Sequence, residues 1–217
     1  MKTLFLHARS TIPVSLPLDD ISRLPQPVGV IASVQFLDRL QDFAAQVKGI
    51  PAGQVLGCKT GPAQEIAERV SCFLFIGSGK FHPLGVAIST GKPVFCYDPS
   101  VGAITRIEDK DIEAHKARQR GALLNFLKAS KVGVLVSTKP GQARMAQALA
   151  FKRACKDKEV SVFVFDTLDR EYLDNFTFIE SWVNTACPRM PETFGKGMVS
   201  IDDVLNACPQ YSIKDLQ

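Results

Sequence analysis

Apolar residues follow two alternating patterns along the chain, and this alternation predicts an α/β fold. Residues 28–33 form an apolar, β-branched run without a charge, which is typical of a strand buried on both faces of a parallel sheet. From Val34 to Val47 the apolar residues recur at helical spacing, and Gly49 follows. The two segments predict a strand followed by a helix, which is the repeating element of a parallel sheet.

Strands and helices continue to alternate through the first half of the chain. Three further strands and two helices are expected here, over residues 54–58, 72–77 and 93–98 and over residues 63–70 and 82–90. A charged stretch from Thr105 to Arg120 then leads into apolar residues at 123–127 and predicts a solvated helix that joins two halves. This alternation implies parallel pairing with right-handed crossovers.

The opening apolar phrase recurs in the second half of the chain. Residues 132–137 match the pattern of residues 28–33 with a shift of 104 residues (132 minus 28). A repeat of this size predicts two tandem homologous three-layer α/β units with mostly parallel sheets. We expect a leading strand and linker over 1–27, a first domain over 28–128, and a second domain over 129–217 that ends in a tail. The second domain is expected to hold helices over 142–156, 169–176 and 201–206 and strands over 132–137, 160–165 and 182–184.

Composition places the chain among globular proteins and excludes several functions. Of its 217 residues, 46% are hydrophobic and 22% are charged, which excludes fibrous and disordered classes. The net charge of +4 is scattered and only 8% of residues are aromatic, so direct nucleic-acid binding is not expected. No apolar run reaches the roughly 20 residues that a membrane helix needs, and His7 and Arg9 interrupt the opening apolar stretch. We therefore expect a cytoplasmic protein without a membrane span.

The six cysteines are the most informative side chains, and they stand at positions 58, 72, 96, 155, 187 and 208. In a reducing compartment they are more often buried or metal-binding than disulfide-bonded. Cys72 and Cys96 fall inside apolar strands and are expected to be buried, whereas Cys155, on a basic helix, is expected to be a surface thiol. Cys58 and Cys187 each follow a strand, one per repeat. Thiolates from separate strand ends suit an iron–sulfur cluster or a zinc site, although burial is the common role of a single cysteine.

Two loops at strand ends suggest either anion binding or a simple turn. Residues 77–80 (GSGK) permit close backbone approach and add a cation, but they lack the spacing of a P-loop, so ATP hydrolysis has little support. The hydroxyls of residues 137–142 are expected to cap the following helix, even where a ligand also binds. His82 is a candidate catalytic acid or base, or a hydrogen-bond donor to a bound carboxylate. Alternatively, it has a structural role and closes the loop by a hydrogen bond. Three arginines are either carboxylate clamps or ordinary surface groups: Arg106, Arg118 and Arg189.

Four phrases in a fixed order carry a family resemblance. They are QVLGC at 54–58, GSGKFHPLG at 77–85 with TGKP at 90–93, STKPGQ at 137–142, and VNTACPR at 183–189. Together they resemble the diphthamide synthesis family, specifically its archaeal 2-(3-amino-3-carboxypropyl)histidine synthases. The resemblance covers nearly all of the chain from Val28 to Pro191.

This resemblance implies a fold, a cofactor and a reaction. The family has three homologous α/β domains, each of which gives one cysteine to a central [4Fe-4S] cluster whose open iron binds S-adenosylmethionine. Radical cleavage of the bond from sulfur to the γ-carbon provides a 3-amino-3-carboxypropyl group for a histidine of translation elongation factor two, the first step of diphthamide biosynthesis. By this analogy Cys58 and Cys187 are metal ligands, and the S-adenosylmethionine pocket is lined by Ser78, Gly79, His82, Ser137, Thr138, Lys139 and Gln142. No residue is assigned as catalytic.

The chain departs from the family pattern at its beginning. Residues 3–8 resemble the last strand of the family's first domain, and no cysteine precedes Cys58. Because two thiolates do not hold a [4Fe-4S] cluster in the usual three-cysteine manner, three alternatives remain. A related chain supplies the third cysteine in a homodimer or heterodimer, Cys96 substitutes, or no cluster forms. Three functions are weighed separately from these alternatives: the transferase, a noncatalytic scaffold or electron-supporting subunit, and a cluster-free S-adenosylmethionine-binding module.

Overall fold

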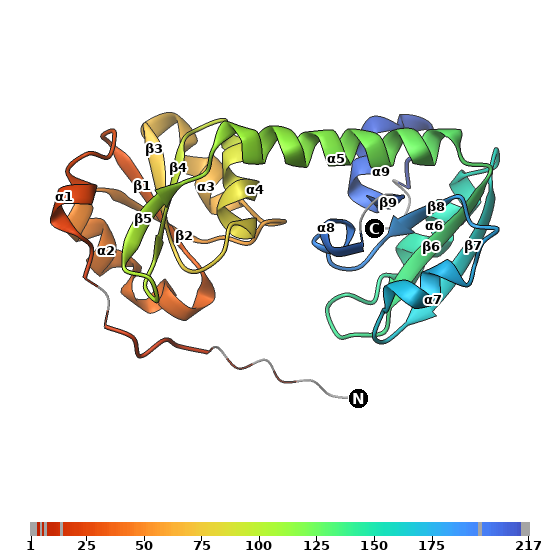
Figure 1. The fold of residues 1–217 in the computed structure, drawn as a ribbon, viewed down its shortest axis with the longest axis horizontal. Helices are drawn as coiled ribbons and strands as arrows, with labels where there is room; N and C mark the ends of the chain where they lie inside the picture. The colour runs from red at the N-terminus through yellow and green to blue at the C-terminus, as the bar shows by residue number, and fades with distance from the viewer. Residues whose placement is uncertain (1–3, 5, 7, 14, 195–196, 214–217) are drawn as a thin grey trace. The chain divides into compact units, whose positions relative to one another are not determined.

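Two compact units make up the chain, unit 1 over residues 1–113 and unit 2 over residues 114–217 (Figure 1). The computed structural model describes residues 4, 6, 8–13, 15–194 and 197–213, so half of the leading strand expected over 3–8 lies outside the described residues. The division between the units falls inside α5 (Asp109–Lys128), a highly charged helix. Within the described part of the chain, no helix combines the length and apolar composition needed to cross a membrane.

A five-stranded sheet in the order β2-β1-β3-β4-β5 forms the centre of unit 1. Its first four strands pair in parallel, and the last one pairs antiparallel with β4: β1 (Val28–Ala32), β2 (Ile50–Gln54), β3 (Cys72–Ile76), β4 (Val94–Asp98) and β5 (Ala103–Arg106). The helices of this unit are α1 (Leu18–Ile21), η1 (Val34–Arg39), α2 (Leu40–Val47), α3 (Gly61–Ile66), η2 (Ala67–Arg69) and α4 (Phe81–Thr90). The predicted α/β class with mostly parallel strands is confirmed.

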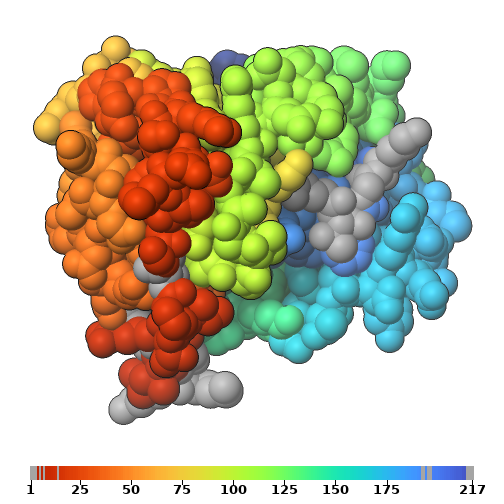
Figure 2. Space-filling view, turned by 60° about the vertical axis from the view of Figure 1, so that its left-hand side comes forward, coloured from red at the N-terminus to blue at the C-terminus, as the bar shows by residue number. Residues whose placement is uncertain are grey.

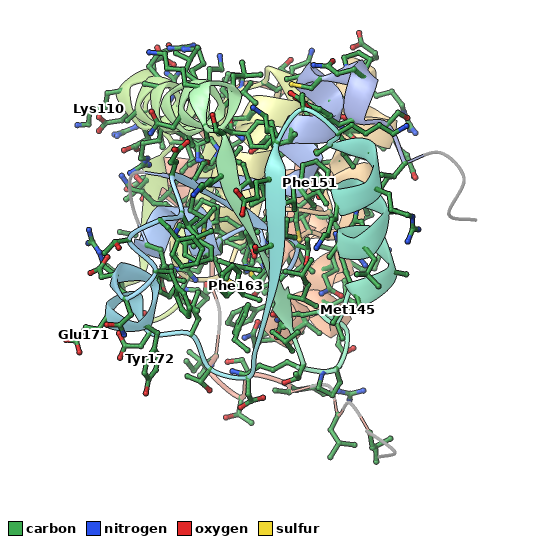
Figure 3. The ribbon with its side chains drawn as sticks, turned by 90° about the vertical axis from the view of Figure 1, so that its right-hand side faces the viewer. Lys110, Met145, Phe151, Phe163, Glu171 and Tyr172 are labelled. Atoms are coloured by element: carbon green, nitrogen blue, oxygen red, sulfur yellow. The ribbon has the colours of Figure 1, made fainter. Side chains whose placement is uncertain are left out.

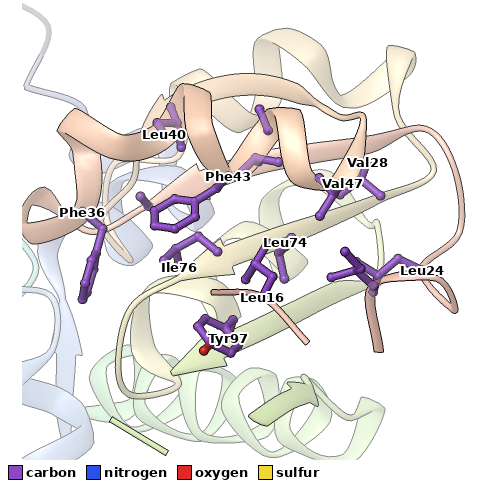
Figure 4. Packing of buried hydrophobic residues seen from close by; sticks show 14 of the residues in the cluster. Leu16, Leu24, Val28, Phe36, Leu40, Phe43, Val47, Leu74, Ile76 and Tyr97 are labelled. Atoms are coloured by element: carbon purple, nitrogen blue, oxygen red, sulfur yellow. The ribbon is translucent and has the colours of Figure 1, made fainter. Parts of the chain in front are cut away.

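Alternating side chains of the central strands enter two separate cores on the two faces of this sheet. In β3, Leu74 and Ile76 join the core formed with α2, and Figure 4 shows them together with Phe43 of that helix. Phe73 and Phe75 instead join the core formed with α3 and α4. Because both faces are covered by apolar helices, the central strands β1 and β3 are apolar and buried along their whole length, as the sequence indicates.

Residues 15–24 complete the first of these cores. Leu16 is 3% exposed and packs in the same cluster as Tyr97 (Figure 4), whose Oη donates to the carbonyl of Ser15 at 3.0 Å. The N–H of Leu16 donates to Oε1 of Gln46 at 3.2 Å. Figure 2 shows this N-terminal segment, in red, lying along the surface of unit 1. The segment before Val28 therefore contributes to the hydrophobic core.

Unit 2 is built on a four-stranded parallel sheet in the order β7-β6-β8-β9. The strands are β6 (Lys131–Ser137), β7 (Glu159–Phe165), β8 (Ser181–Asn184) and β9 (Met198–Ser200), and the helices are α6 (Met145–Ala154), α7 (Arg170–Asp174), α8 (Met190–Phe194), α9 (Ile201–Ala207) and η3 (Pro209–Tyr211). Figure 3 shows Phe151 of α6 and Phe163 of β7 on opposite sides of the sheet. Phe163 packs edge-to-face on Trp182, with ring centroids 4.9 Å apart.

The core of unit 2 gathers around Phe126, near the end of α5. Phe126 is completely buried, and its ring lies 6.1 Å from that of Phe151 and 5.7 Å from that of Tyr211. Nζ of Lys158 lies 5.1 Å from the centroid of the Phe126 ring and donates to the carbonyl of Ala129 at 2.8 Å. This contact supplies a cation to the C-terminal end of α5, where helix carbonyls lack partners.

The internal repeat has a direct structural counterpart. Gly29 of β1 pairs with Phe73 of β3, and Gly133 of β6 pairs with Trp182 of β8. In both pairs a Cβ on the glycine would overlap the aromatic ring on the neighbouring strand. The glycine in each Val-Gly-Val phrase therefore makes room for an aromatic side chain at the same register, which explains why the phrase recurs.

Three predicted boundaries are wrong at the edges of the sheets. The strand expected over 54–58 lies four residues earlier, at Ile50–Gln54. It is the edge strand β2, and an edge position can accommodate Pro51 and Gly53, which argue against a strand in the sequence. The predicted helix over 105–120 starts only at Asp109, since residues 103–106 form β5. The three-residue strand β9 lies where a surface tail was expected, and part of that tail, residues 195–196, lies outside the described residues. Short edge strands have too few residues for the sequence to show the apolar and polar alternation that is typical of a strand.

Candidate functional site

Cys58 lies at the tip of a tight turn between β2 and α3. The backbones of Leu56 and Lys59 exchange two hydrogen bonds of 3.0 Å, which close the turn around Gly57 and Cys58. Cys58 is exposed. The turn follows the carboxyl end of a parallel strand, which is where open α/β sheets place their ligands.

The first turns of α4 hold this loop in place. The N–H of Gly57 donates to Nδ1 of His82 at 3.0 Å. A Cβ on Gly85 would lie 2.5 Å from the carbonyl oxygen of Gly57, and a Cβ on Gly57 would overlap the ring of Phe81. The backbone beside Cys58 therefore lies directly against the backbone of α4, with no side chain between them.

Cys187 lies on a second fixed loop, three residues after β8. The side-chain amide of Asn184 forms two hydrogen bonds with this loop. Its Nδ2 donates to the carbonyl of Cys187 at 2.8 Å, and its Oδ1 accepts from the N–H of Ala186 at 2.9 Å. Oγ1 of Thr185 donates to the carbonyl of Leu135 at 2.8 Å and ties the loop to β6. Asn184 and Thr185 are buried, whereas Cys187 is half-buried. These hydrogen bonds tie the loop down, and Cys187 stays partly exposed on it.

The other four cysteines are buried. The burial expected for Cys72 and Cys96 is confirmed, and burial raises the pKa of the Cys96 thiol to about 12. The surface thiol expected at Cys155 is wrong, because α6 ends at Ala154 and Cys155 turns into the core, where it is 2% exposed. Burial raises its pKa to about 12. Since a thiolate is the form that binds metal, Cys96 is a poor substitute for a missing ligand.

We expect iodoacetamide to modify Cys58 and Cys187 well before the four buried cysteines. A pKa of about 12 instead of the usual 9 reduces the thiolate fraction of Cys96 and Cys155 roughly a thousandfold at neutral pH, in addition to the steric block of the core. Peptide mass spectrometry on a time course measures the six rates. In 8 M urea, a denaturing control, all six should react at similar rates. Equal rates in the folded protein would contradict the assignment of accessible thiols.

The loop at 77–80 resembles a turn more than an anion site. The N–H of Gly77 donates to the carbonyl of Tyr97 at 3.0 Å, and Gly79 has a φ of +76°, which favours glycine. Nζ of Lys80 lies 2.9 Å from a carboxylate oxygen of Asp111, and the hydrogen bond from this ammonium lowers the pKa of Asp111. The cation of the loop is thus balanced by a carboxylate of α5. Ser78 and Gly79 are exposed beside it.

The second polar loop, residues 137–142, does not cap α6 as expected. The helix begins only at Met145, and no side chain caps its first turn. Instead Oγ of Ser137 accepts from the N–H of Lys139 at 3.1 Å, and Oγ1 of Thr138 donates to Oδ1 of Asp166 at 3.1 Å. The hydroxyls thus stabilise the loop itself. The contacts of these residues, and of Gln142, with S-adenosylmethionine stay a prediction.

A cavity of about 480 Å³ opens in unit 2 beside the Cys187 loop. Pro188 and Val199 contribute to its apolar wall, and Arg118, Gln119 and Asp203 contribute polar groups. Nε2 of Gln119 donates to Oδ1 of Asp203 at 3.2 Å, and burial raises the pKa of that carboxyl. The volume suits a small-molecule ligand, since such sites commonly measure about 300–1,000 Å³. Sequence reasoning singled out Arg118 but missed Asp203, which lies in an ordinary amphipathic helix.

Metal-ligating side chains do not converge within either unit. Among the described residues, no group of three or more His, Cys, Asp or Glu side chains could hold a metal ion. The two accessible thiols also follow non-equivalent strands: Cys58 follows β2, and Cys187 follows β8, whose counterpart in unit 1 is β3. The predicted meeting of the two sulfurs stays a prediction. Chemically, two accessible thiols on fixed loops fit two thiolate ligands of an iron–sulfur cluster.

The fold and these loops define a tandem α/β protein that presents one accessible thiol per unit beyond the carboxyl end of a strand. The model of a family described as putative diphthamide synthesis protein matches residues 1–201, and the chain belongs to this family. The predicted family is confirmed.

Individual relatives support the same assignment. The 2-(3-amino-3-carboxypropyl)histidine synthase of Pyrococcus horikoshii is 38% identical over 141 residues, which cover 64% of this chain and 39% of that protein. A protein of Dictyostelium discoideum named 2-(3-amino-3-carboxypropyl)histidine synthase subunit 1 is 25% identical over 191 residues, which cover 78% of this chain and 40% of that protein. The crystal structure of Dph2 from Pyrococcus horikoshii with a 4Fe-4S cluster matches with a TM-score of 0.74 and 29% identity, covering 87% of this chain and 59% of that one. The chain spans less than half the length of these two curated relatives.

Proposed function

We propose that the chain is part of a transferase that moves a 3-amino-3-carboxypropyl group from S-adenosylmethionine to a histidine of translation elongation factor two, with Cys58 and Cys187 as ligands of a [4Fe-4S] cluster. The single observation that carries the proposal is the exposure of the cysteines: the two that match the family's ligands are accessible on fixed loops, while the other four are buried. When bound, the cluster supplies the electron that breaks the bond between sulfur and the γ-carbon.

The third ligand is proposed to come from a related chain, in a homodimer or heterodimer. This is supported by the lack of a three-residue metal group among the described side chains and by the burial of Cys96. A relative named as subunit 1 points in the same direction, because that name implies an assembly of more than one chain. Six free cysteines are also consistent with the proposed cytoplasmic location.

The cavity of unit 2 is proposed to contribute to the binding of S-adenosylmethionine. The cavity supports this because Pro188, in its wall, directly follows Cys187, and its volume suits a ligand of this class. Arg118 is suited to a carboxylate, and Asp203 to an ammonium group, which are the two charged ends of an amino acid. The predicted contacts of Ser78, Gly79, His82, Ser137, Thr138, Lys139 and Gln142 belong to the same proposal.

Iron analysis tests the proposal. We expect that anaerobic reconstitution with ferrous iron and sulfide yields about four irons per complex when the chain is mixed with a related chain that offers a free third cysteine. A suitable partner is Pyrococcus horikoshii Dph2 with its own counterparts of Cys58 and Cys187 replaced by alanine, and the iron is counted beyond what this variant binds alone. A mixture with no additional iron would contradict the assignment of Cys58 and Cys187.

The alternative function is a noncatalytic subunit that scaffolds or electronically supports a complete partner. The observation that favours it is the same lack of a complete metal group in the described residues. A complex that forms stably but gains no iron through this chain would support the scaffold. A colourless protein that binds S-adenosylmethionine in calorimetry would support a cluster-free binding module.

A further inference from the structure

We propose that His82 and Asn184 are positioning residues, which fix the loops of Cys58 and Cys187 so that each thiol is presented to a metal in one conformation. The proposal rests on the proposed function, because the metal in question is the cluster. It gives His82 a role distinct from its expected contact with S-adenosylmethionine. It also assigns a role to Asn184, which sequence reasoning placed at a strand end without a function.

His82 acts on Cys58 through the backbone of Gly57. Nδ1 accepts the N–H of Gly57 at 3.0 Å, so the proton of the neutral ring is on Nε2. Edge-to-face contacts orient the ring, with centroids 5.5 Å from Phe81 and 6.1 Å from Phe75. An imidazole ring that is packed between two aromatic rings and has a defined tautomer has little freedom to move. It therefore fixes the position of the Gly57 amide, which immediately precedes Cys58 in the chain.

Asn184 acts on Cys187 through two bonds from one side chain. Its amide accepts from Ala186 and donates to Cys187, so it spans the two peptide groups that flank the cysteine's own N–H. The side chain is 1% exposed, and water therefore cannot replace either bond. A buried amide with both ends used in this way has only one low-energy orientation.

Fixed loops matter because a thiolate ligand must meet the metal at a set distance and angle. Removing a group that hydrogen-bonds to a metal ligand and orients it commonly lowers metal affinity by about 10- to 100-fold. Both loops are oriented by side-chain hydrogen bonds to their backbone. Neither side chain needs to contact the metal to affect its binding.

Replacing His82 by Phe or by Asn separates the acceptor from the ring. H82F keeps an aromatic ring between Phe75 and Phe81 but removes the acceptor for Gly57. H82N loses the ring, yet its Oδ1 takes the place of Nδ1. We expect H82F to lose hydrogen-exchange protection at the Gly57 amide and to release iron to a chelator about 10- to 100-fold faster than the unsubstituted complex, and H82N to stay within a few-fold of it.

The matched test in unit 2 uses an isosteric change. N184D keeps the acceptor for Ala186 but removes the donor to the Cys187 carbonyl, and N175D makes the same chemical change at an exposed position at the end of α7. We expect N184D to release iron at least about 10-fold faster and to shift the electron paramagnetic resonance spectrum of the reduced cluster. N175D should change neither the iron release nor the spectrum.

The outcomes distinguish this inference from the proposed function. Iron that binds to the unsubstituted complex but is retained equally by H82F, H82N and N184D would overturn the positioning role and leave the cluster assignment intact. If the unsubstituted complex gains no iron through this chain, both the cluster and the positioning role are overturned. If Gly57 keeps its exchange protection in H82F, the hydrogen bond to His82 is not what holds the loop.

Discussion

Replacing either Cys58 or Cys187 by alanine is expected to abolish the cluster contributed through this chain. Each thiol is the accessible one of its unit, and the structure places no group of three metal-ligating side chains among the described residues that could compensate for its loss. A cluster that loses a thiolate ligand becomes labile, so the absorbance near about 400 nm, which arises from charge transfer between thiolate and iron, should disappear. The measurement is an absorption spectrum together with iron and sulfide content, taken on the reconstituted complex.

The matched control is Cys96→Ala in unit 1. This thiol is buried in β4 and its pKa is raised to about 12, so its removal should leave the absorbance unchanged. If C96A removes the absorbance while C58A retains it, Cys96 is the ligand and the site assignment is wrong. Survival of the absorbance in both C58A and C187A would show that neither loop binds the cluster.

A Phe126→Ala substitution is expected to lower the free energy of unfolding of unit 2 by about 3–5 kcal/mol. Phe126 is fully buried among Phe151 and Tyr211, and Nζ of Lys158 lies over its ring. Removing the ring leaves a cavity and also takes away the aromatic face that this ammonium contacts. Urea titration followed by tryptophan fluorescence measures the effect, because the single tryptophan, Trp182, lies in β8 of the same unit.

Leu124→Ala is the control for this substitution. Leu124 lies two residues earlier on α5 and is 55% exposed, so its truncation should cost less than about 1 kcal/mol. Both variants truncate an apolar side chain of the same helix to alanine, one buried and one exposed. Equal urea midpoints for F126A and L124A would contradict the central place of Phe126 in this core.

The buried strands could be predicted from the sequence because their apolar runs are long and uncharged. β1, β3, β4, β6 and β7 lie within a residue or two of the predicted positions. β5 and β9 could not be predicted, since four and three residues at the edges of sheets show no period, and β2 contains Pro51 and Gly53. The burial of Cys155 could not be predicted either, because it depends on where α6 ends. The helix ends at Ala154, one residue before Cys155, and Cys155 turns into the core instead of lying on the exposed face of the helix.

The site could be predicted only in part. The two cysteines were identified from their phrases, and their exposure relative to the other four supports that choice. The bond from Gly57 to His82 joins residues 25 apart and depends on how α4 packs, so no local pattern indicates it. The expected caps of α6 were wrong because the helix starts at Met145, three residues after the predicted start at 142. The hydroxyls of the preceding loop therefore form hydrogen bonds within that loop.

The glycine contact beneath Cys58 has a mechanical consequence. Where Gly85 meets Gly57, main chain rests on main chain, with room for no side chain at either position. The contact between Gly85 and Gly57 has no side-chain rotamers of its own, so around Gly57 only the neighbouring side chains of Phe81 and His82 can change rotamer as temperature rises. The backbone beside Cys58 is therefore supported on α4 by a main-chain contact in addition to the hydrogen bond to His82, and side-chain motion acts on only part of this support.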